Sequence, residues 1–179
     1  MDTRSGRRVS HNRCVNPSQR FMAEAIGVSD GDLLTELVIA GYTPQTIALI
    51  EFAPLVRLAW ADGHVSQRQR YAIAQVAVRE HLRNDTPAAK RLAEWLERCP
   101  SDEVFDVSMS TIRAKWDGLP LDACEVLQRR FIGDCTAVAR GADGVVTDNK
   151  IAPEEGRVLA KILVSLKPSR QTNGRRDEQ

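Results

Sequence analysis

The fold is decided by residues 58–69, which read LAWADGHVSQRQ. An apolar segment with helical spacing runs into Ala-Asp-Gly here, and a polar Ser-Gln-Arg-Gln segment follows two residues later. Gly63 is the residue type that ends a helix in the left-handed conformation without a steric penalty. Ser66 and Gln69 have the spacing of a capping box, in which each side chain accepts a hydrogen bond from the other's backbone N–H. The stretch therefore predicts two helices joined by a short connection.

A second copy of this unit lies at residues 139–155, which read ARGADGVVTDNKIAPEE. One residue separates Gly63 from Val65 in the first copy, whereas six residues separate Gly144 from Ile151 in the second. Two helix hairpins of this kind would pack as a compact bundle with pseudo-two-fold symmetry. Four positions correspond between the copies: Asp62 and Asp143, Gly63 and Gly144, Val65 and Ile151, and Gln69 and Glu155.

Helical periodicity dominates the rest of the chain, and the alternation typical of strands is nearly absent. We therefore expect an all-α fold, a compact bundle of about seven helices with two pseudo-symmetric helix-hairpin halves. Pro54 predicts a break near Phe52 in the third of these helices. The predicted helices cover residues 18–26, 32–40, 43–62, 87–98, 101–116 and 121–140, and two more begin at Ser66 and Pro153. The predicted buried stripe of the helix from Ser66 consists of Tyr71, Ile73, Ala74, Val76 and Ala77.

Length and composition predict one domain between two tails. The chain has 179 residues, of which 42% are hydrophobic, 27% charged and 5% aromatic, and this mixture suits a helical globular domain. The net charge is +4 over residues 1–20 and +2 over residues 167–179, which leaves −5 for the body. We expect disordered basic tails at residues 1–19 and 167–179 around a helical domain of residues 20–166.

The chain shows no apolar export signal and no apolar run of roughly 18 residues. These features predict a cytoplasmic protein with reduced cysteines and no transmembrane segment. The four cysteines lack Cys-x-x-Cys spacing and the three histidines lack zinc-site spacing, so we expect both sets to be inert. No nucleic-acid-binding motif accompanies the arginines, so no nucleic-acid partner is expected.

The duplicated Ala-Asp-Gly unit resembles the tellurite-resistance TerB-like family over residues 43–166. The resemblance implies an all-helical fold with two related halves and an acidic site for a divalent metal, with calcium as the expected ion. It also implies a non-enzymatic role in stress response through protein partners, in some members at the inner membrane surface. The family pattern has Glu where Gln69 stands in this chain. The second copy, which keeps Glu155, is therefore the better candidate for metal binding.

Carboxylate oxygens are the ligands that calcium prefers, and it takes six to eight oxygens in a flexible arrangement. The loop of the second copy is not an EF-hand, because Val145 and Thr147 stand where two of the ligands would belong. A simpler interpretation stays open, in which these carboxylates only stabilise turns and helix N-termini. Five acidic residues are the candidate metal ligands: Asp62, Asp143, Asp148, Glu154 and Glu155.

Three functions remain open from the sequence. The first is a TerB-like stress-response protein that binds a divalent cation and acts through partners. The second is a metal-free helical module for protein–protein interaction, in which Ala-Asp-Gly is only a folding device. The third is an enzyme with an unrecognised site, and it has the least support because the chain lacks a phosphate loop, Gly-x-Ser-x-Gly, His-Glu-x-x-His and a dinucleotide fingerprint.

Overall fold

The computed structural model of the chain describes residues 16–141 and 151–166. Within these residues the protein has eight α-helices, one short 3-10 helix and no strand, which confirms the all-α prediction. No helix in this part of the chain combines the length and the apolar character needed to cross a membrane. In chain order the elements are α1 (Pro17–Ile26), α2 (Gly31–Ile39), η1 (Ile47–Glu51), α3 (Ala53–Ala59), α4 (Gln67–Arg79), α5 (Pro87–Glu97), α6 (Asp102–Asp117), α7 (Leu121–Ala139) and α8 (Pro153–Ser165).

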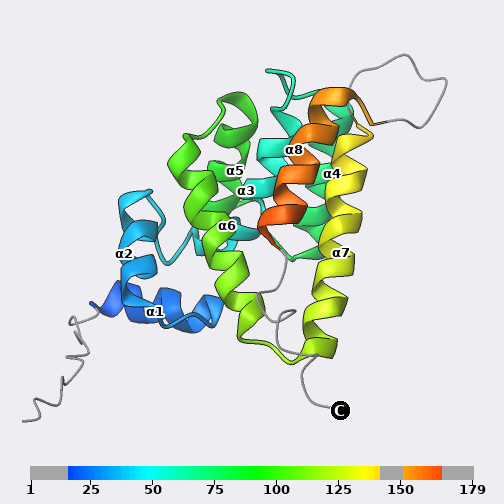
Figure 1. Ribbon diagram of the computed structural model, residues 1–179. Helices are drawn as coiled ribbons and strands as arrows, with labels where there is room; N and C mark the ends of the chain where they lie inside the picture. Colours follow the sequence, from blue (N-terminus) through cyan, green and yellow to red (C-terminus); the bar gives the residue numbers. More distant parts are fainter. Residues whose placement is uncertain (1–15, 142–150, 167–179) are drawn as a thin grey trace, which may run out of the picture.

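The short helix α3 lies in the middle of the bundle, with α6, α7 and α8 packed around it (Figure 1). Every residue of α3 except Arg57 is buried, and a helix that is apolar on all sides can be stable only in such a central place. Helix α4 packs along α7, while α1 and α2 lie together and reach the core through η1 and α6. The end of α3 is thus buried in the core, and the Ala-Asp-Gly connection leads from it to the surface.

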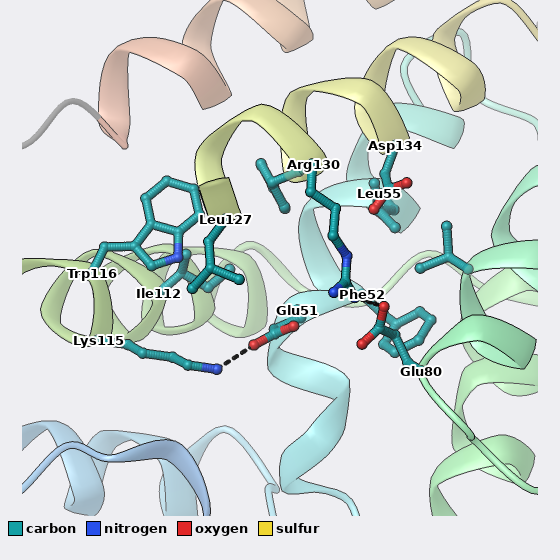
Figure 2. A pocket seen from close by; sticks show the side chains of 12 residues that line it. Glu51, Phe52, Leu55, Glu80, Ile112, Lys115, Trp116, Leu127, Arg130 and Asp134 are labelled. Atoms are coloured by element: carbon teal, nitrogen blue, oxygen red, sulfur yellow. Dashed lines mark hydrogen bonds and ion pairs between the residues drawn. The ribbon is translucent and has the colours of Figure 1, made fainter. Parts of the chain in front are cut away.

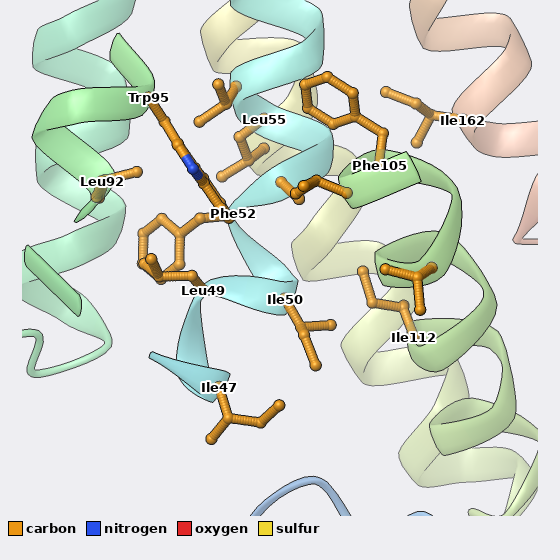
Figure 3. Close-up of a cluster of buried hydrophobic side chains, with 14 of the residues drawn as sticks. Ile47, Leu49, Ile50, Phe52, Leu55, Leu92, Trp95, Phe105, Ile112 and Ile162 are labelled. Atoms are coloured by element: carbon orange, nitrogen blue, oxygen red, sulfur yellow. The ribbon is translucent and has the colours of Figure 1, made fainter. Parts of the chain in front are cut away.

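The core is built mainly from aliphatic side chains, with a few aromatic rings among them (Figure 3). Its members come from every helix of the described residues, so burial of apolar surface holds together elements that are far apart in the sequence. The residues labelled in Figure 3 are Ile47, Leu49, Ile50, Phe52, Leu55, Leu92, Trp95, Phe105, Ile112 and Ile162.

A buried hydroxyl pair fastens the segment after α2 to α6. The Oγ of Ser108 donates to the carbonyl oxygen of Val104 at 2.5 Å, and the Tyr42 hydroxyl lies 2.6 Å from the same Oγ. Because the single proton of Ser108 goes to Val104, the Tyr42 hydroxyl is the donor in the second bond. The Tyr42 ring also meets Trp95 edge-on with ring centroids 6.1 Å apart. Burial raises the pKa of Tyr42 well above its usual value.

The predicted helix over residues 43–62 was wrong at its start and right about its break. The backbone bonds after Thr43 link residues three apart, from the Thr46 N–H to the Thr43 carbonyl at 3.0 Å and from the Leu49 N–H to the Thr46 carbonyl at 2.9 Å, which is the pattern of turns and 3-10 helices. Residues 47–51 then form a 3-10 helix, and α3 begins only after Phe52. Pro54 lacks an N–H and occupies the first turn of α3, which separates the two helices where the sequence predicted a break.

The predicted buried stripe of α4 needs one correction. Ile73 and Val76 are buried as expected, but the Tyr71 residue is 67% exposed and Ala74 is exposed. The buried face follows Gln69, Ile73 and Val76, at spacings of four and three residues. Tyr71 lies two positions from Gln69 and Ile73, and residues with that spacing do not share a helix face. The burial of Gln69 thus turns the tyrosine toward solvent.

Candidate functional site

The connection of the first copy ends in a complete capping box. Ser66 precedes α4 in an extended conformation, and its Oγ accepts a hydrogen bond of 3.2 Å from the Gln69 N–H. The Gln69 Oε1 in turn accepts from the Ser66 N–H at 2.9 Å. Gly63 has a φ of 88°, the left-handed conformation predicted for it. Both parts of the sequence prediction for this connection are confirmed.

The end of α7, where the second copy begins, sits directly on this capping box. The Ser66 Oγ donates a hydrogen bond of 2.5 Å to the carbonyl oxygen of Gly141. A Cβ atom at Gly141 would lie 2.9 Å from the backbone nitrogen of Gln69, a distance that real Cβ contacts do not show. A glycine is therefore required there for α7 to come this close to α4. Gly141, near the start of the second copy, thus lies against Ser66 and Gln69 of the first copy, which the sequence alone did not reveal.

The start of α8 has the same backbone conformation as the start of α4 but a different chemistry. Ala152 occupies the N-cap position with φ −66° and ψ 155°, close to the −70° and 162° of Ser66, and it has no side chain that could cap the helix. Glu155 occupies the position that Gln69 holds in α4, and it is 0% exposed. Neither of its carboxylate oxygens has a hydrogen-bond partner among the described residues.

A carboxylate in such a place is unusual, because burying an ionised group without a partner is strongly unfavourable. The first copy avoids this problem with a neutral amide whose Oε1 is satisfied by Ser66. The amide of Gln69 is 1% exposed, and its Nε2 has no partner within the part of the chain that the structure describes. The charge of Glu155 therefore calls for a proton or a cation, and this residue is the strongest candidate for a functional group.

Of the other predicted metal ligands, Asp62 and Glu154 lie within the described residues, and they form no metal-binding group with Glu155. Asp62 is at the surface, where its Oδ1 accepts from the His64 N–H at 3.3 Å. Glu154 is exposed and pairs with Arg157 at 2.5 Å. Asp143 and Asp148 lie outside the described residues. Among residues 16–141 and 151–166, no three His, Cys, Asp or Glu side chains are arranged to hold a metal ion.

The cysteines in the described residues do not form a nucleophilic site. Cys124 and Cys135 are buried on α7, as the sequence predicted, and burial raises the pKa of Cys135 to about 12. Cys99 is exposed, and partial desolvation raises the pKa of its thiol as well. A thiol with a raised pKa is protonated at neutral pH and is a poor nucleophile or metal ligand.

A pocket of about 210 Å³ lies between η1, α3, α4, α6 and α7 (Figure 2). Two ion pairs cross it: Lys115 Nζ lies 2.5 Å from a Glu51 oxygen, and Arg130 pairs with Glu80. Arg130, on α7, is one of the residues that line the pocket. Its partner and the pocket walls come from separate helices, so no local spacing in the sequence could have indicated the pocket.

Comparison with known proteins adds nothing to the description of Glu155 or of the pocket. No family model, no curated protein and no solved structure matches the chain. The resemblance to the TerB-like family therefore rests on the duplicated Ala-Asp-Gly unit and its helical surroundings.

Proposed function

We propose that the chain is a TerB-like, non-enzymatic stress-response protein of the cytoplasm that binds a divalent cation through Glu155 and acts through protein partners. The observation that carries the proposal is the carboxylate of Glu155, which is 0% exposed and has no hydrogen-bond partner for either oxygen among the described residues. A hard cation satisfies both oxygens at once and removes the cost of burying the charge. Calcium is the ion we expect.

The sequence supplies further oxygen ligands on both sides of Glu155. Asp143 and Asp148 precede it in the same copy, and Glu154 is its neighbour on the first turn of α8. Calcium is usually held by several carboxylates together with backbone carbonyls. In the proposal Glu155 is the buried ligand, and Asp143, Asp148 and Glu154 complete the site. Asp62 of the first copy has a surface position with His64 as its neighbour, and it is the weakest member of the set.

The packing of the helices supports the proposal of two related halves. Helix α4 of the first hairpin packs on α7 of the second, and α8 of the second hairpin packs on α3 of the first. Helices α3 and α7, which precede the two Ala-Asp-Gly units, also pack on each other. A pseudo-two-fold axis between α3 and α7 would produce this exchange of partners, and it would place the two capping positions at the same end of the bundle.

Thermal unfolding with EDTA and then with millimolar calcium, magnesium or manganese tests the proposal. A ligand that binds only the folded state adds about 1.4 kcal/mol for each tenfold excess over its dissociation constant. We expect a calcium-dependent rise of several degrees in the wild type and none in Glu155→Gln. Glu103→Gln is the matched control, because Glu103 is also a carboxylate in the first turn of a helix but is fully exposed.

The opposite pattern would identify Glu155 as a protonated carboxyl group. In that case no cation changes the melting temperature of the wild type, and Glu155→Gln is as stable as the wild type in EDTA. Isothermal titration of the wild type with calcium gives an independent reading, since a bound ion releases or absorbs heat whether or not it changes the melting temperature. Absence of both heat and stabilisation would remove the cation from the proposal.

A metal-free interaction module is the second candidate, and one surface feature favours it. Tyr71 and Val78 of α4 are 67% and 72% exposed, and their spacing of seven residues puts them on one face of the helix. A partner helix could cover this face without any cation. Measurement of partner binding in EDTA distinguishes the two candidates. The metal-free module would bind its partner unchanged, whereas the cation-dependent protein would lose binding.

The enzyme hypothesis has weaker support. The pocket of Figure 2 contains the carboxylates of Glu51, Glu80 and Asp134, which could in principle act as acids or bases. Each of them is engaged by a lysine or an arginine: Glu51 by Lys115, and Glu80 and Asp134 by Arg79.

A further inference from the structure

We propose that the pocket between η1, α3, α4, α6 and α7 binds a small apolar monocarboxylate, with the carboxylate on Arg130 and the apolar body against the floor of the pocket. We call it the Arg130 pocket. The proposal is separate from the cation site at Glu155, which does not line this pocket. The proposal rests on two features of the pocket. One is its apolar floor, and the other is that Glu80 has two basic partners at the rim, Arg79 and Arg130.

The floor of the Arg130 pocket is apolar and rigid. Phe52, Leu55 and Ile112 contribute to it, and each is at most 2% exposed. Trp116 and Phe131 form one wall, where their rings meet edge-on with centroids 5.6 Å apart. A volume of about 210 Å³ exceeds that of the roughly 150 Å³ apolar cavity known to hold benzene. The pocket therefore has room for a body of about eight carbon atoms.

A second pocket of about 210 Å³ lies beside the first, and the two share Phe52, Ile112, Glu80 and the Glu51–Lys115 pair. Its other walls are mostly apolar and include Ile47 and Ile50 of η1. A flexible alkyl chain suits a pocket of this size with apolar walls, so a medium-chain fatty acid is the class of ligand that we expect.

The rim determines the charge of the head group. Glu80 is held by two guanidinium groups, since Arg79 Nε lies 3.2 Å from the same oxygen that pairs with Arg130. A carboxylate from a ligand can therefore take Arg130, and Glu80 keeps Arg79 as its partner. Arg79 itself stays in place through two hydrogen bonds to Asp134, at 2.9 and 2.5 Å.

A cationic head group would have to compete with basic side chains that are already in place. Glu51 is held by Lys115 at 2.5 Å, Asp134 by Arg79, and Glu80 by both Arg79 and Arg130. Figure 2 shows the Arg130 guanidinium beside Glu80 at the rim, with Leu127 and the apolar floor next to it. An arginine with a planar fork of donors is also well suited to a carboxylate. The rim thus favours an anion.

Isothermal titration with three eight-carbon probes tests the charge and the place of binding. The probes are octanoate, octan-1-ol and octylammonium, each below its micelle concentration. We expect octanoate to bind with one-to-one stoichiometry and at least tenfold more tightly than the other two. Arg130→Gln should weaken octanoate binding about tenfold. Arg129→Gln is the matched control and should leave binding unchanged, because Arg129 is the neighbouring arginine of α7 and its side chain is 77% exposed.

Leu127→Phe locates the apolar body, because the larger ring takes up part of the Arg130 pocket. We expect this variant to weaken octanoate binding about tenfold while its circular dichroism spectrum and melting temperature stay close to those of the wild type. Equal binding of octanoate to the wild type and to Arg130→Gln would overturn the proposal, and so would a preference for octylammonium or the absence of octanoate binding. Octanoate binding that survives in Glu155→Gln keeps this inference distinct from the proposed cation site.

Discussion

The Oγ of Ser66 donates a hydrogen bond of 2.5 Å to the carbonyl oxygen of Gly141, and the two residues are 75 positions apart in the chain. The same Oγ accepts the Gln69 N–H, so one hydroxyl both caps α4 and holds the end of α7. In the first copy, Ser66 and Gln69 satisfy each other in the capping box. The second copy instead contains a buried carboxylate with no partner among the described residues. This difference between the copies leads to the first three predictions.

Gly141→Ala should lower the free energy of unfolding by about 2 kcal/mol, because the new methyl group would lie 2.9 Å from the Gln69 nitrogen and overpack the contact. Gly133→Ala, on the same helix, is the control. Gly133 is exposed and an added methyl group would meet nothing within 4 Å, so alanine should raise stability by about 0.5 kcal/mol. Urea unfolding of both variants checks the prediction, and equal effects would contradict it.

Ser66→Ala should destabilise the protein by about 2 kcal/mol. Roughly half of this comes from the lost N-cap and the rest from the Gly141 carbonyl, which would be left buried without its donor. Ser101 is the comparison, since it occupies the N-cap of α6 without a capping hydrogen bond and is exposed. Ser101→Ala should cost much less. The two melting temperatures decide the matter, and similar losses would mean that the bond to Gly141 contributes little.

Ala152→Ser should stabilise the cation-free protein by about 1 kcal/mol. The backbone of Ala152 already has the conformation of an N-cap, so a serine hydroxyl there can accept the N–H of Glu155 as Ser66 does for Gln69. The substitution converts the second copy toward the chemistry of the first. Chemical unfolding in EDTA measures the effect, and a variant less stable than the wild type would show that the start of α8 does not behave like the start of α4.

Stability should fall as the solution becomes alkaline, because two buried acids keep their protons in the folded state. Burial raises the pKa of Cys135 from 9.0 to about 12 and also raises that of Tyr42 above 10.0. Above pH 9 the unfolded chain loses the Cys135 proton and the folded chain keeps it, so each pH unit up to about 12 costs as much as about 1.4 kcal/mol.

Urea unfolding across this range measures the slope, and Cys135→Ala and Tyr42→Phe should each flatten it. In Tyr42→Phe the Ser108 hydroxyl keeps its bond to Val104, so this variant should remain folded at neutral pH. A slope that is the same in the wild type and in both variants would assign the alkaline loss of stability to other groups.

The sequence predicted those parts of the fold whose signals are local. The spacing of Ser66 and Gln69 predicted a capping box, and Gly63 predicted a left-handed residue, because both effects act within a few positions of the chain. The start of the helix predicted at residue 43 was wrong, because the backbone there forms hydrogen bonds between residues three apart instead of four. Helical periodicity does not distinguish a turn followed by a 3-10 helix from the first turns of an α-helix.

The candidate site was predictable only in part. Correspondence between the copies identified Glu155 as a residue of interest, but its complete burial depends on how α8 packs against α3, α6 and α7. The contact of Gly141 with Ser66 joins two loops, and the Arg130 pocket joins five elements. Such contacts arise from tertiary packing and leave no spacing in the sequence that a single chain could reveal.

The long span of the bond between Ser66 and Gly141 also has a kinetic consequence. Closing a loop of 75 residues costs chain entropy, and this bond needs the finished ends of both α4 and α7. We expect it to form after the rate-limiting barrier, so Ser66→Ala should leave the refolding rate unchanged and speed unfolding about thirtyfold for a loss of about 2 kcal/mol. Stopped-flow measurement of both rates checks this, and slower refolding would place the contact in the nucleus. The bond therefore lowers the unfolding rate, while the local helix signals determine the folding rate.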